Sequence, residues 1–132
     1  MQQRRSVLAL TALVMLVAFV VGCASTTTPT PGPTTGGDTI TVTAAGMAFD
    51  TSTITVSAGT RVTITFINND GGVPHNIAFY TSPSATTVIY KGARTTGVAT
   101  VTYTFDAPTT PGTYFFRCDV HPSTMTGEFI VT

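Results

Sequence analysis

The chain has 132 residues, a length that suits one domain of ordinary size. Only 9% of its residues are charged, and six Lys and Arg residues balance six Asp and Glu residues. Because no basic patch or stripe stands out, the composition gives no reason to expect nucleic acid as a partner. Removal of the first 22 residues would leave four basic and six acidic residues, a net charge of −2.

Residues 1–22 are predicted to be a signal peptide of the lipoprotein type. Two arginines precede a nearly continuous apolar run over residues 7–21, which is the order expected of an export signal. A permanent membrane-spanning helix is the alternative, but a run of about 15 residues is shorter than the roughly 20 that cross a bilayer. The end of the run, Val20-Val21-Gly22-Cys23, resembles the lipobox of bacterial lipoproteins, with Val20 in place of the usual Leu. That resemblance implies cleavage before Cys23 and acylation of its thiol.

Residues 23–38 are expected to be the lipidated cysteine and a disordered tether. The segment mixes Thr, Pro and Gly without any apolar periodicity, so it cannot bury enough surface to fold. We expect it to lift a folded domain, residues 39–132, off the membrane. With Cys23 acylated, Cys118 remains a free thiol and does not form a disulfide.

From residue 39 onward, apolar residues alternate with Thr and other polar residues. This period of two is typical of strands with one buried face, and Gly-, Asn- and Pro-rich turns separate the runs. The fold class predicted is therefore all-β, an eight-stranded Greek-key β-sandwich. The expected strands are 39–45, 53–57, 61–67, 75–80, 87–91, 98–105, 112–118 and 126–132.

Four side chains, three of them near the end of the chain, form a candidate metal site. Cys118, His121 and Met125 lie within eight residues, and His75 lies 43 residues before Cys118. Two imidazoles, a thiolate and a weak axial thioether are the ligands of a mononuclear blue-copper electron-transfer site. Taken singly, each residue has an ordinary structural explanation, such as core packing for the thiol and the thioether. Zinc is the chemical rival, but structural zinc sites rarely use Met.

These residues lie in two motifs that resemble the cupredoxins, the family of plastocyanin, azurin and amicyanin. The motifs are Gly-Val-Pro-His-Asn at residues 72–76 and Pro-Gly-Thr-Tyr-Phe-Phe-Arg-Cys-Asp-Val-His-Pro-Ser-Thr-Met-Thr-Gly at residues 111–127. The resemblance implies equatorial ligands at His75, Cys118 and His121 and an axial ligand at Met125. It also implies that Asn76 braces the ligand loop and that Gly127 lets the chain turn away close to the metal.

The spacing within the second motif departs from the named members. One more residue separates His121 from Met125 than in amicyanin, and one fewer than in plastocyanin. Azurin has the same His-to-Met gap but a longer Cys-to-His gap. Loop length influences the copper–Met distance and the reduction potential, so neither value can be carried over from any one member. Met47 is expected in the core or at the edge of the site, and not as a ligand.

The resulting functional hypothesis is a membrane-tethered electron carrier and not an enzyme. Four ligands are accounted for and no further histidine is present to bind a substrate. The expected partners are redox proteins of a respiratory or photosynthetic chain. The protein itself is expected to be an exported monomer, lipid-anchored on the outer side of the cytoplasmic membrane or in the periplasm. The partners are expected to dock on apolar residues around the edge of His121, namely Val73, Pro74 and Pro122. The alternatives are a periplasmic copper-delivery protein with the same ligands and a structural surface module without metal.

Overall fold

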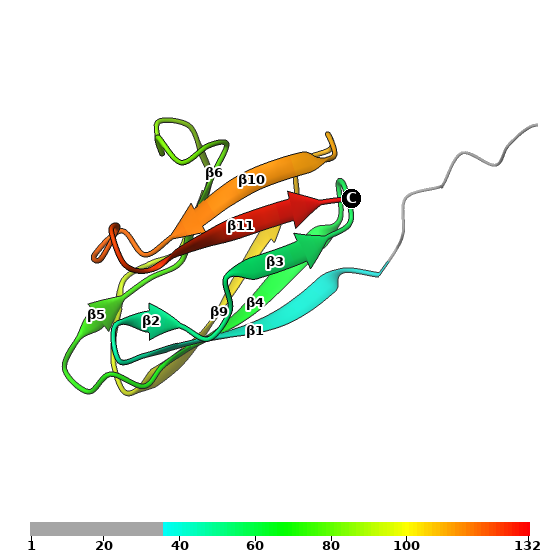
Figure 1. Cartoon of the computed structure of the whole chain (residues 1–132). Coiled ribbons are helices and arrows are strands. Elements are labelled where there is room, and N and C mark those ends of the chain that lie inside the picture. The colour runs from blue at the N-terminus through cyan, green and yellow to red at the C-terminus, as the bar shows by residue number, and fades with distance from the viewer. Residues whose placement is uncertain (1–35) are drawn as a thin grey trace, which may run out of the picture. The chain divides into compact units, whose positions relative to one another are not determined.

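The computed structural model describes residues 36–132, which form two packed β-sheets and a small two-stranded ribbon (Figure 1). The first sheet has the strand order β2-β1-β4-β9 and the second the order β3-β11-β10-β6-β7, while β5 pairs with β8. The strands are β1 (Asp38–Ala45), β2 (Ala48–Phe49), β3 (Thr53–Val56), β4 (Arg61–Asn68), β5 (Pro74–His75), β6 (Ala78–Tyr80), β7 (Val88–Lys91), β8 (Thr95–Thr96), β9 (Ala99–Asp106), β10 (Gly112–Arg117) and β11 (Thr126–Val131).

The predicted all-β sandwich is confirmed, with more strands than expected. All eight predicted strands are present in the described residues, but the one expected over 75–80 is divided into β5 and β6. The short strands β2 and β8 are additional. Strands β1 and β4 pair in parallel, as do β11 and β3, and the remaining strand pairs are antiparallel. Each parallel pair requires the chain to cross between the sheets before it returns.

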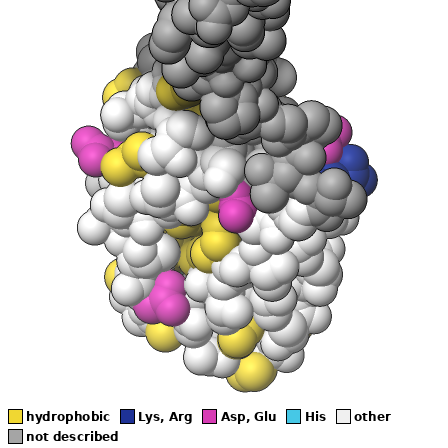
Figure 2. Space-filling view, turned by 90° about the vertical axis from the view of Figure 1, so that its right-hand side faces the viewer, with side chains coloured by type: hydrophobic (Ala, Val, Ile, Leu, Met, Phe, Trp, Pro, Cys, Tyr) yellow, Lys and Arg dark blue, Asp and Glu magenta, His cyan; other side chains and the backbone are white. Residues whose placement is uncertain are grey.

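Alternation along the strands produces the core, as the sequence predicts. In β4, Val62, Ile64 and Phe66 are completely buried, and in β9, Tyr103 and Phe105 are buried. The threonines between the β9 residues are exposed, because successive side chains in a strand point to opposite faces. On the face that Figure 2 shows, white atoms, which belong to the backbone and to uncharged polar side chains, predominate over charged ones.

Aromatic rings join the two sheets. Phe79 on β6 lies 4.7 Å from Phe105 on β9 and 4.8 Å from Phe129 on β11, measured between ring centroids. Tyr90 on β7 stacks on Phe105 with an angle of 9° between the ring planes. Offset and edge-to-face pairs of this kind stabilise a core by about 0.5–1.5 kcal/mol beyond the area that they bury. The two layers are thereby fixed relative to each other.

The loop after β10, strand β5 and the β1–β2 turn lie at the same end of the sandwich (Figure 1). The first described strand begins at the other end, where the Asp38 carboxylate accepts hydrogen bonds from the Ser57 amide and the Thr60 hydroxyl. A strand of eight residues such as β1 spans roughly 23 Å between its first and last Cα atoms, which is the scale of the separation between these two ends.

Within residues 36–132, no helix has the length and hydrophobicity to cross a bilayer. The predicted signal peptide, Cys23 and most of the predicted tether lie outside the described residues.

Gly127 lies within β11, opposite Phe116 of β10. A Cβ atom at this position would lie 2.6 Å from the carbonyl oxygen of Ser52 and would overlap the Phe116 ring. The absence of a side chain therefore allows the ring and the Ser52 backbone to pack against the strand from two directions. Close packing within a strand is one of the ordinary reasons for a glycine at such a position.

We predict that Gly127→Ala destabilises the domain by about 1–3 kcal/mol, because overpacking forces the ring or the backbone to move. In a domain of this size, each kcal/mol lowers the melting temperature by about 4–8 °C. Thermal unfolding followed by circular dichroism measures the change. Gly71→Ala is the matched control, since no atom lies within 4 Å of a Cβ atom there. Equal melting temperatures for the two variants would contradict the packing explanation.

Candidate metal centre

Three side chains converge at the end of the sandwich that holds β5 and the loop after β10. The Sγ atom of Cys118 lies 3.8 Å from Nδ1 of His75 and 3.9 Å from Nδ1 of His121, and the two Nδ1 atoms are 3.1 Å apart. His75 and Cys118 are completely buried, whereas His121 is half-buried. Within residues 36–132, these three residues form the one group of His, Cys, Asp or Glu side chains with metal-binding geometry.

The size of this triangle fits a single small metal ion. The point equidistant from the three donor atoms lies about 2.1 Å from each of them, which matches protein metal–nitrogen and metal–sulfur bonds of about 2.0–2.3 Å. A His₂Cys set in a trigonal arrangement is the donor set that selects copper for electron transfer. Both imidazoles present the same nitrogen, Nδ1, toward the centre.

The sheet positions two of these donors directly. His75 ends β5, and Cys118 follows β10 immediately. Between them lies β6, which pairs with β10 so that Ala78 is opposite Arg117. Because backbone hydrogen bonds fix this register, the thiol and the imidazole approach each other although 43 residues separate them in sequence.

The remaining ligand loop is closed by its own backbone. The amide of Cys118 donates to the carbonyl of Met125 at 2.9 Å, and the amide of Met125 donates to the carbonyl of His121 at 3.1 Å. The loop therefore returns to its starting point, and β11 begins at the next residue. Met125 is 1% exposed and belongs to the hydrophobic core. The side chain of Met125 is therefore in the core at the end of the loop that carries Cys118 and His121.

Asn76 connects the loop to the neighbouring segments. Its side-chain oxygen Oδ1 accepts a hydrogen bond from the backbone amide of Asp119 at 2.8 Å. Its side-chain nitrogen Nδ2 donates to the backbone carbonyl of Gly92 at 3.0 Å. Asn76 is completely buried, so both bonds are shielded from water. It thereby links the residue after His75 to the residue after Cys118.

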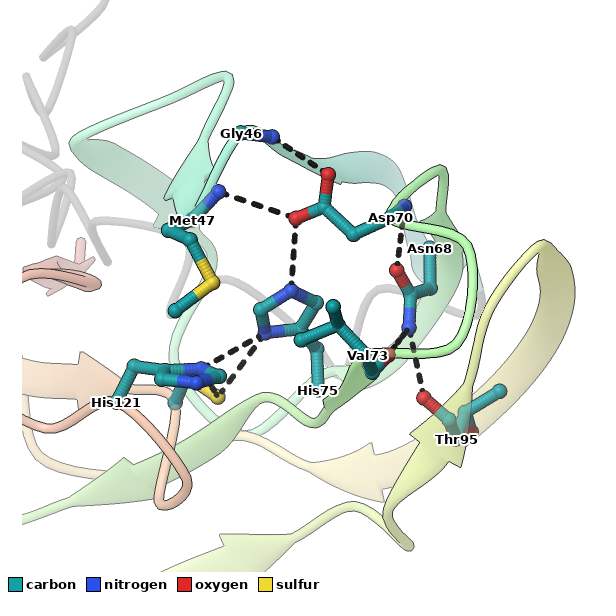
Figure 3. A network of polar contacts seen from close by, with 9 residues as sticks. Gly46, Met47, Asn68, Asp70, Val73, His75, Thr95 and His121 are labelled. Atoms are coloured by element: carbon teal, nitrogen blue, oxygen red, sulfur yellow. Dashed lines mark hydrogen bonds and ion pairs between the residues drawn. The ribbon is translucent and has the colours of Figure 1, made fainter.

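Asp70 contacts the far side of the His75 ring (Figure 3). Its Oδ2 atom lies 2.9 Å from Nε2 of His75, the nitrogen that faces away from the donor triangle. The same carboxylate accepts hydrogen bonds from the amides of Met47 and Gly46 at 3.0 and 2.7 Å. These two amides, together with His75, hold the pKa of Asp70 below its usual value.

Asn68 shapes the segment between β4 and β5. It is completely buried, and its side-chain amide donates to the carbonyls of Val73 and Thr95 while its oxygen accepts from the amide of Asp70. Sequence reasoning identified residues 68–72 only as a turn and missed both Asn68 and Asp70. Turn composition was the only signal there, because the groups that Asp70 binds at Gly46 and Met47 are more than 20 residues away.

The side chain of Asp119 is only 5% exposed and is surrounded by donors. Its carboxylate accepts hydrogen bonds from the Tyr80 hydroxyl at 2.6 Å and from Nε of Arg117 at 2.9 Å, and Nζ of Lys91 lies 2.9 Å from its other oxygen. Burial opposes ionisation, but the bonds from Tyr80, Lys91 and Arg117 outweigh it and lower the pKa of Asp119 to about 2. The guanidinium of Arg117 also lies over the Tyr80 ring, 4.9 Å from its centroid. Asp119 thus ties β6, β7 and β10 together beside Cys118.

The other residues predicted for the site have different surroundings. Val73 and Pro74 are half-buried and Pro122 is exposed. Met47 is 42% exposed, and its thioether lies next to the two imidazoles (Figure 3). It is therefore at the edge of the site and not in the core. Gly127 is inside β11, where packing against Phe116 accounts for the glycine.

Comparison with solved structures identifies blue copper proteins as similar folds. Auracyanin A, a "blue" copper protein of the green thermophilic photosynthetic bacterium Chloroflexus aurantiacus, is 31% identical with a TM-score of 0.65, over 74% of this chain and 100% of that chain. Reduced auracyanin of Roseiflexus castenholzii is 26% identical with a TM-score of 0.65, over 74% and 99%. Amicyanin of Paracoccus versutus is 25% identical with a TM-score of 0.51, over 74% and 84%. Comparison with curated protein sequences gave no match.

The family profile described as the cupredoxin-like domain matches residues 12–131, which is most of the chain. The sandwich, the three converging donors and this match agree with the resemblance carried by the two sequence motifs. The chain therefore belongs to the cupredoxin-like family.

Proposed function

We propose that this protein is a type 1 copper protein that carries single electrons between redox partners outside the cytoplasm. The observation that carries the proposal is the triangle formed by two Nδ1 atoms and one Sγ atom, with separations of 3.1 to 3.9 Å. In this proposal, His75, Cys118 and His121 are the equatorial ligands and Met125 is the axial ligand. Its membership of the cupredoxin-like family and the similarity to a blue copper protein support this assignment.

Bound copper would supply reversible one-electron chemistry between Cu(II) and Cu(I). The chain supplies donors suited to both states, because imidazole accepts either ion while thiolate and thioether favour Cu(I). It also supplies stiffness: Cys118 and Met125 share a backbone hydrogen bond, and Asn76 ties the two ligand segments together. Because the donor atoms are held in place, their geometry would change little when an electron is gained or lost.

The surface around His121 is the proposed docking site for redox partners. His121 is the one half-buried member of the donor triangle, so we propose that electrons enter and leave the site through its imidazole. Pro122 follows His121 in the chain, and Val73 and Pro74 precede His75, so in this proposal these three residues supply uncharged surface around His121. An apolar surface permits brief contacts with different partners, since no buried ion pair must be broken on release.

Membrane tethering through an acylated Cys23 is also part of the proposal. The described domain begins at the end opposite the donor triangle, where Asp38 binds the β3–β4 turn. A tether joined there would leave the donor end free to face away from the membrane. The lipobox and the Thr/Pro/Gly composition of residues 23–38 support this part of the proposal.

Copper delivery is less well supported than electron transfer. A delivery protein must release its ion through ligand exchange, and this requires accessible ligands. Here His75 and Cys118 are completely buried and Met125 is 1% exposed. Tight enclosure favours retention of the ion during oxidation and reduction.

We predict that the purified protein becomes intensely blue or green on addition of Cu(II) and is reversibly bleached by ascorbate. At a free copper concentration 100 times the dissociation constant, binding should raise the free energy of unfolding by about 2.7 kcal/mol. Absorption spectroscopy and thermal unfolding measure the two effects. Cys118→Ser should abolish the colour. A colourless wild-type protein would refute the carrier function, and colour without reversible cycling would favour delivery.

We predict that Met125→Leu keeps the colour but raises the reduction potential. A thioether is a soft donor, but its lone pair still interacts with Cu(II) more strongly than an alkyl group does. The alkyl group also makes the surroundings of the metal more apolar, which disfavours the more highly charged Cu(II) state. Because the two side chains have similar volumes, the cost in core stability should stay below about 1.5 kcal/mol. Spectroelectrochemistry measures the potential. An unchanged potential and an unchanged spectrum would mean that Met125 only packs the core.

We predict that Val73→Lys slows electron self-exchange between copies of the protein. Self-exchange requires two donor ends to meet, and a charge at each would oppose the encounter. NMR line broadening in mixtures of oxidised and reduced protein measures the rate. Val88→Lys is the matched control, since Val88 is 52% exposed and lies on β7. A rate equally reduced in both variants, or unchanged in Val73→Lys, would contradict the proposed docking surface.

A further inference from the structure

The His75–Asp70 contact gives the donor triangle a charged neighbour. The carboxylate meets Nε2 of His75 at 2.9 Å, while Nδ1 of the same ring points to Cys118 and His121. Among the described residues, Asp70 is the carboxylate that contacts a donor imidazole. The other carboxylate close to the site, Asp119, contacts Tyr80, Lys91 and Arg117 instead.

The position of Asp70 is fixed from three directions. Its carboxylate accepts the amides of Gly46 and Met47, and its own amide donates to the side chain of Asn68. The carboxylate therefore cannot rotate away from His75 without losing hydrogen bonds to the β1–β2 turn. The side chain is only 17% exposed, so water screens its charge incompletely.

The β1–β2 turn adopts a conformation that these bonds help to maintain. Gly46 and Met47 have positive φ angles of 59° and 63°. Two successive positive φ angles are typical of the two-residue turns that connect antiparallel strands, and a Met there is strained. The two amides converge on one carboxylate, which offsets the strain and places the Met47 thioether at the edge of the site (Figure 3).

A neutral imidazole carries one proton, and its partner decides which nitrogen holds it. A carboxylate beside Nε2 favours the proton at that nitrogen and leaves the lone pair of Nδ1 directed at the donor triangle. His75 is completely buried, so water does not compete for either nitrogen. The correct tautomer would then be present before any metal binds.

Within the described part of the chain, the charge of Asp70 also has no Lys or Arg partner. Asp119 is paired with Lys91 and Arg117, whereas the ion-pair partner found for Asp70 within residues 36–132 is His75 itself. An uncompensated negative charge one imidazole away from a metal stabilises the more positive oxidation state.

We propose that Asp70 is a positioning residue that fixes His75 as an Nδ1 donor and lowers the reduction potential of the site. The second part rests on the proposed copper function. The first part concerns the protein without metal and is independent of it.

The tautomer is tested on the metal-free wild-type protein. Long-range proton–nitrogen NMR spectra of ¹⁵N-histidine-labelled protein identify which ring nitrogen carries the proton. We expect the proton of the neutral His75 ring to lie on Nε2. A His75 ring protonated on Nδ1, or a mixture of both tautomers, would overturn the positioning role.

The potential is tested with Asp70→Asn, which removes the charge and keeps the shape. We expect the reduction potential to rise in this variant. Asp50→Asn is the matched control, because Asp50 is exposed and binds the Thr43 amide on the same hairpin without touching His75. A shift in Asp70→Asn no larger than in Asp50→Asn would overturn the electrostatic role.

A second pair of variants, both carrying Met47→Gly, separates the effect of the charge from a folding defect in Asp70→Asn. Met47→Gly relieves the strain of the positive φ angle, and addition of Asp70→Asn to that variant isolates the charge. The same rise in potential is expected between these two proteins, and no rise would overturn the proposal. A wild-type protein that takes up no copper would refute the proposed function and the electrostatic role with it. The tautomer spectrum would still decide whether Asp70 positions His75.

Discussion

The structure depends on one constraint, which is that three donor atoms from two distant segments of the chain must meet. The two Nδ1 atoms and Sγ lie within 3.9 Å of one another. This requires β6 to pair with β10 in a fixed register and the loop after Cys118 to close on Met125. The aromatic contacts around Phe79 hold the two sheets in place behind this end. A site fixed in this way has little to rearrange when its charge changes.

Two carboxylates beside the site have different surroundings and, we infer, different roles. Asp119 is neutralised by Lys91 and Arg117 and connects three strands, so its charge serves the fold. Asp70 faces a donor imidazole and backbone amides, so its charge is directed at the site. Placement thus separates a structural ion pair from an electrostatic influence on the metal, although both residues are aspartates.

The sequence was sufficient to predict most of the fold and the donor set. Alternation of apolar and polar residues is a local property, and it located the eight main strands because the side-chain period of a strand is two. The donors were identifiable because the chain has only two histidines and one cysteine beyond the lipobox, at a spacing found in cupredoxins. The division of residues 75–80 into two strands was missed, because it depends on β5 pairing with β8 and not with β10.

The residues around the donors were decided by tertiary structure alone. Asp70 appeared to belong to a turn, since its partners at Gly46 and Met47 come from another hairpin. Gly127 was expected to let the chain turn away close to the metal, and the Phe116 ring that packs on it could not be predicted from the sequence. Local periodicity and residue chemistry determine strands and ligand types, because both are written along the chain. Which group lies beside which ligand depends on strand register and sheet packing, and these bring together residues that no local pattern connects.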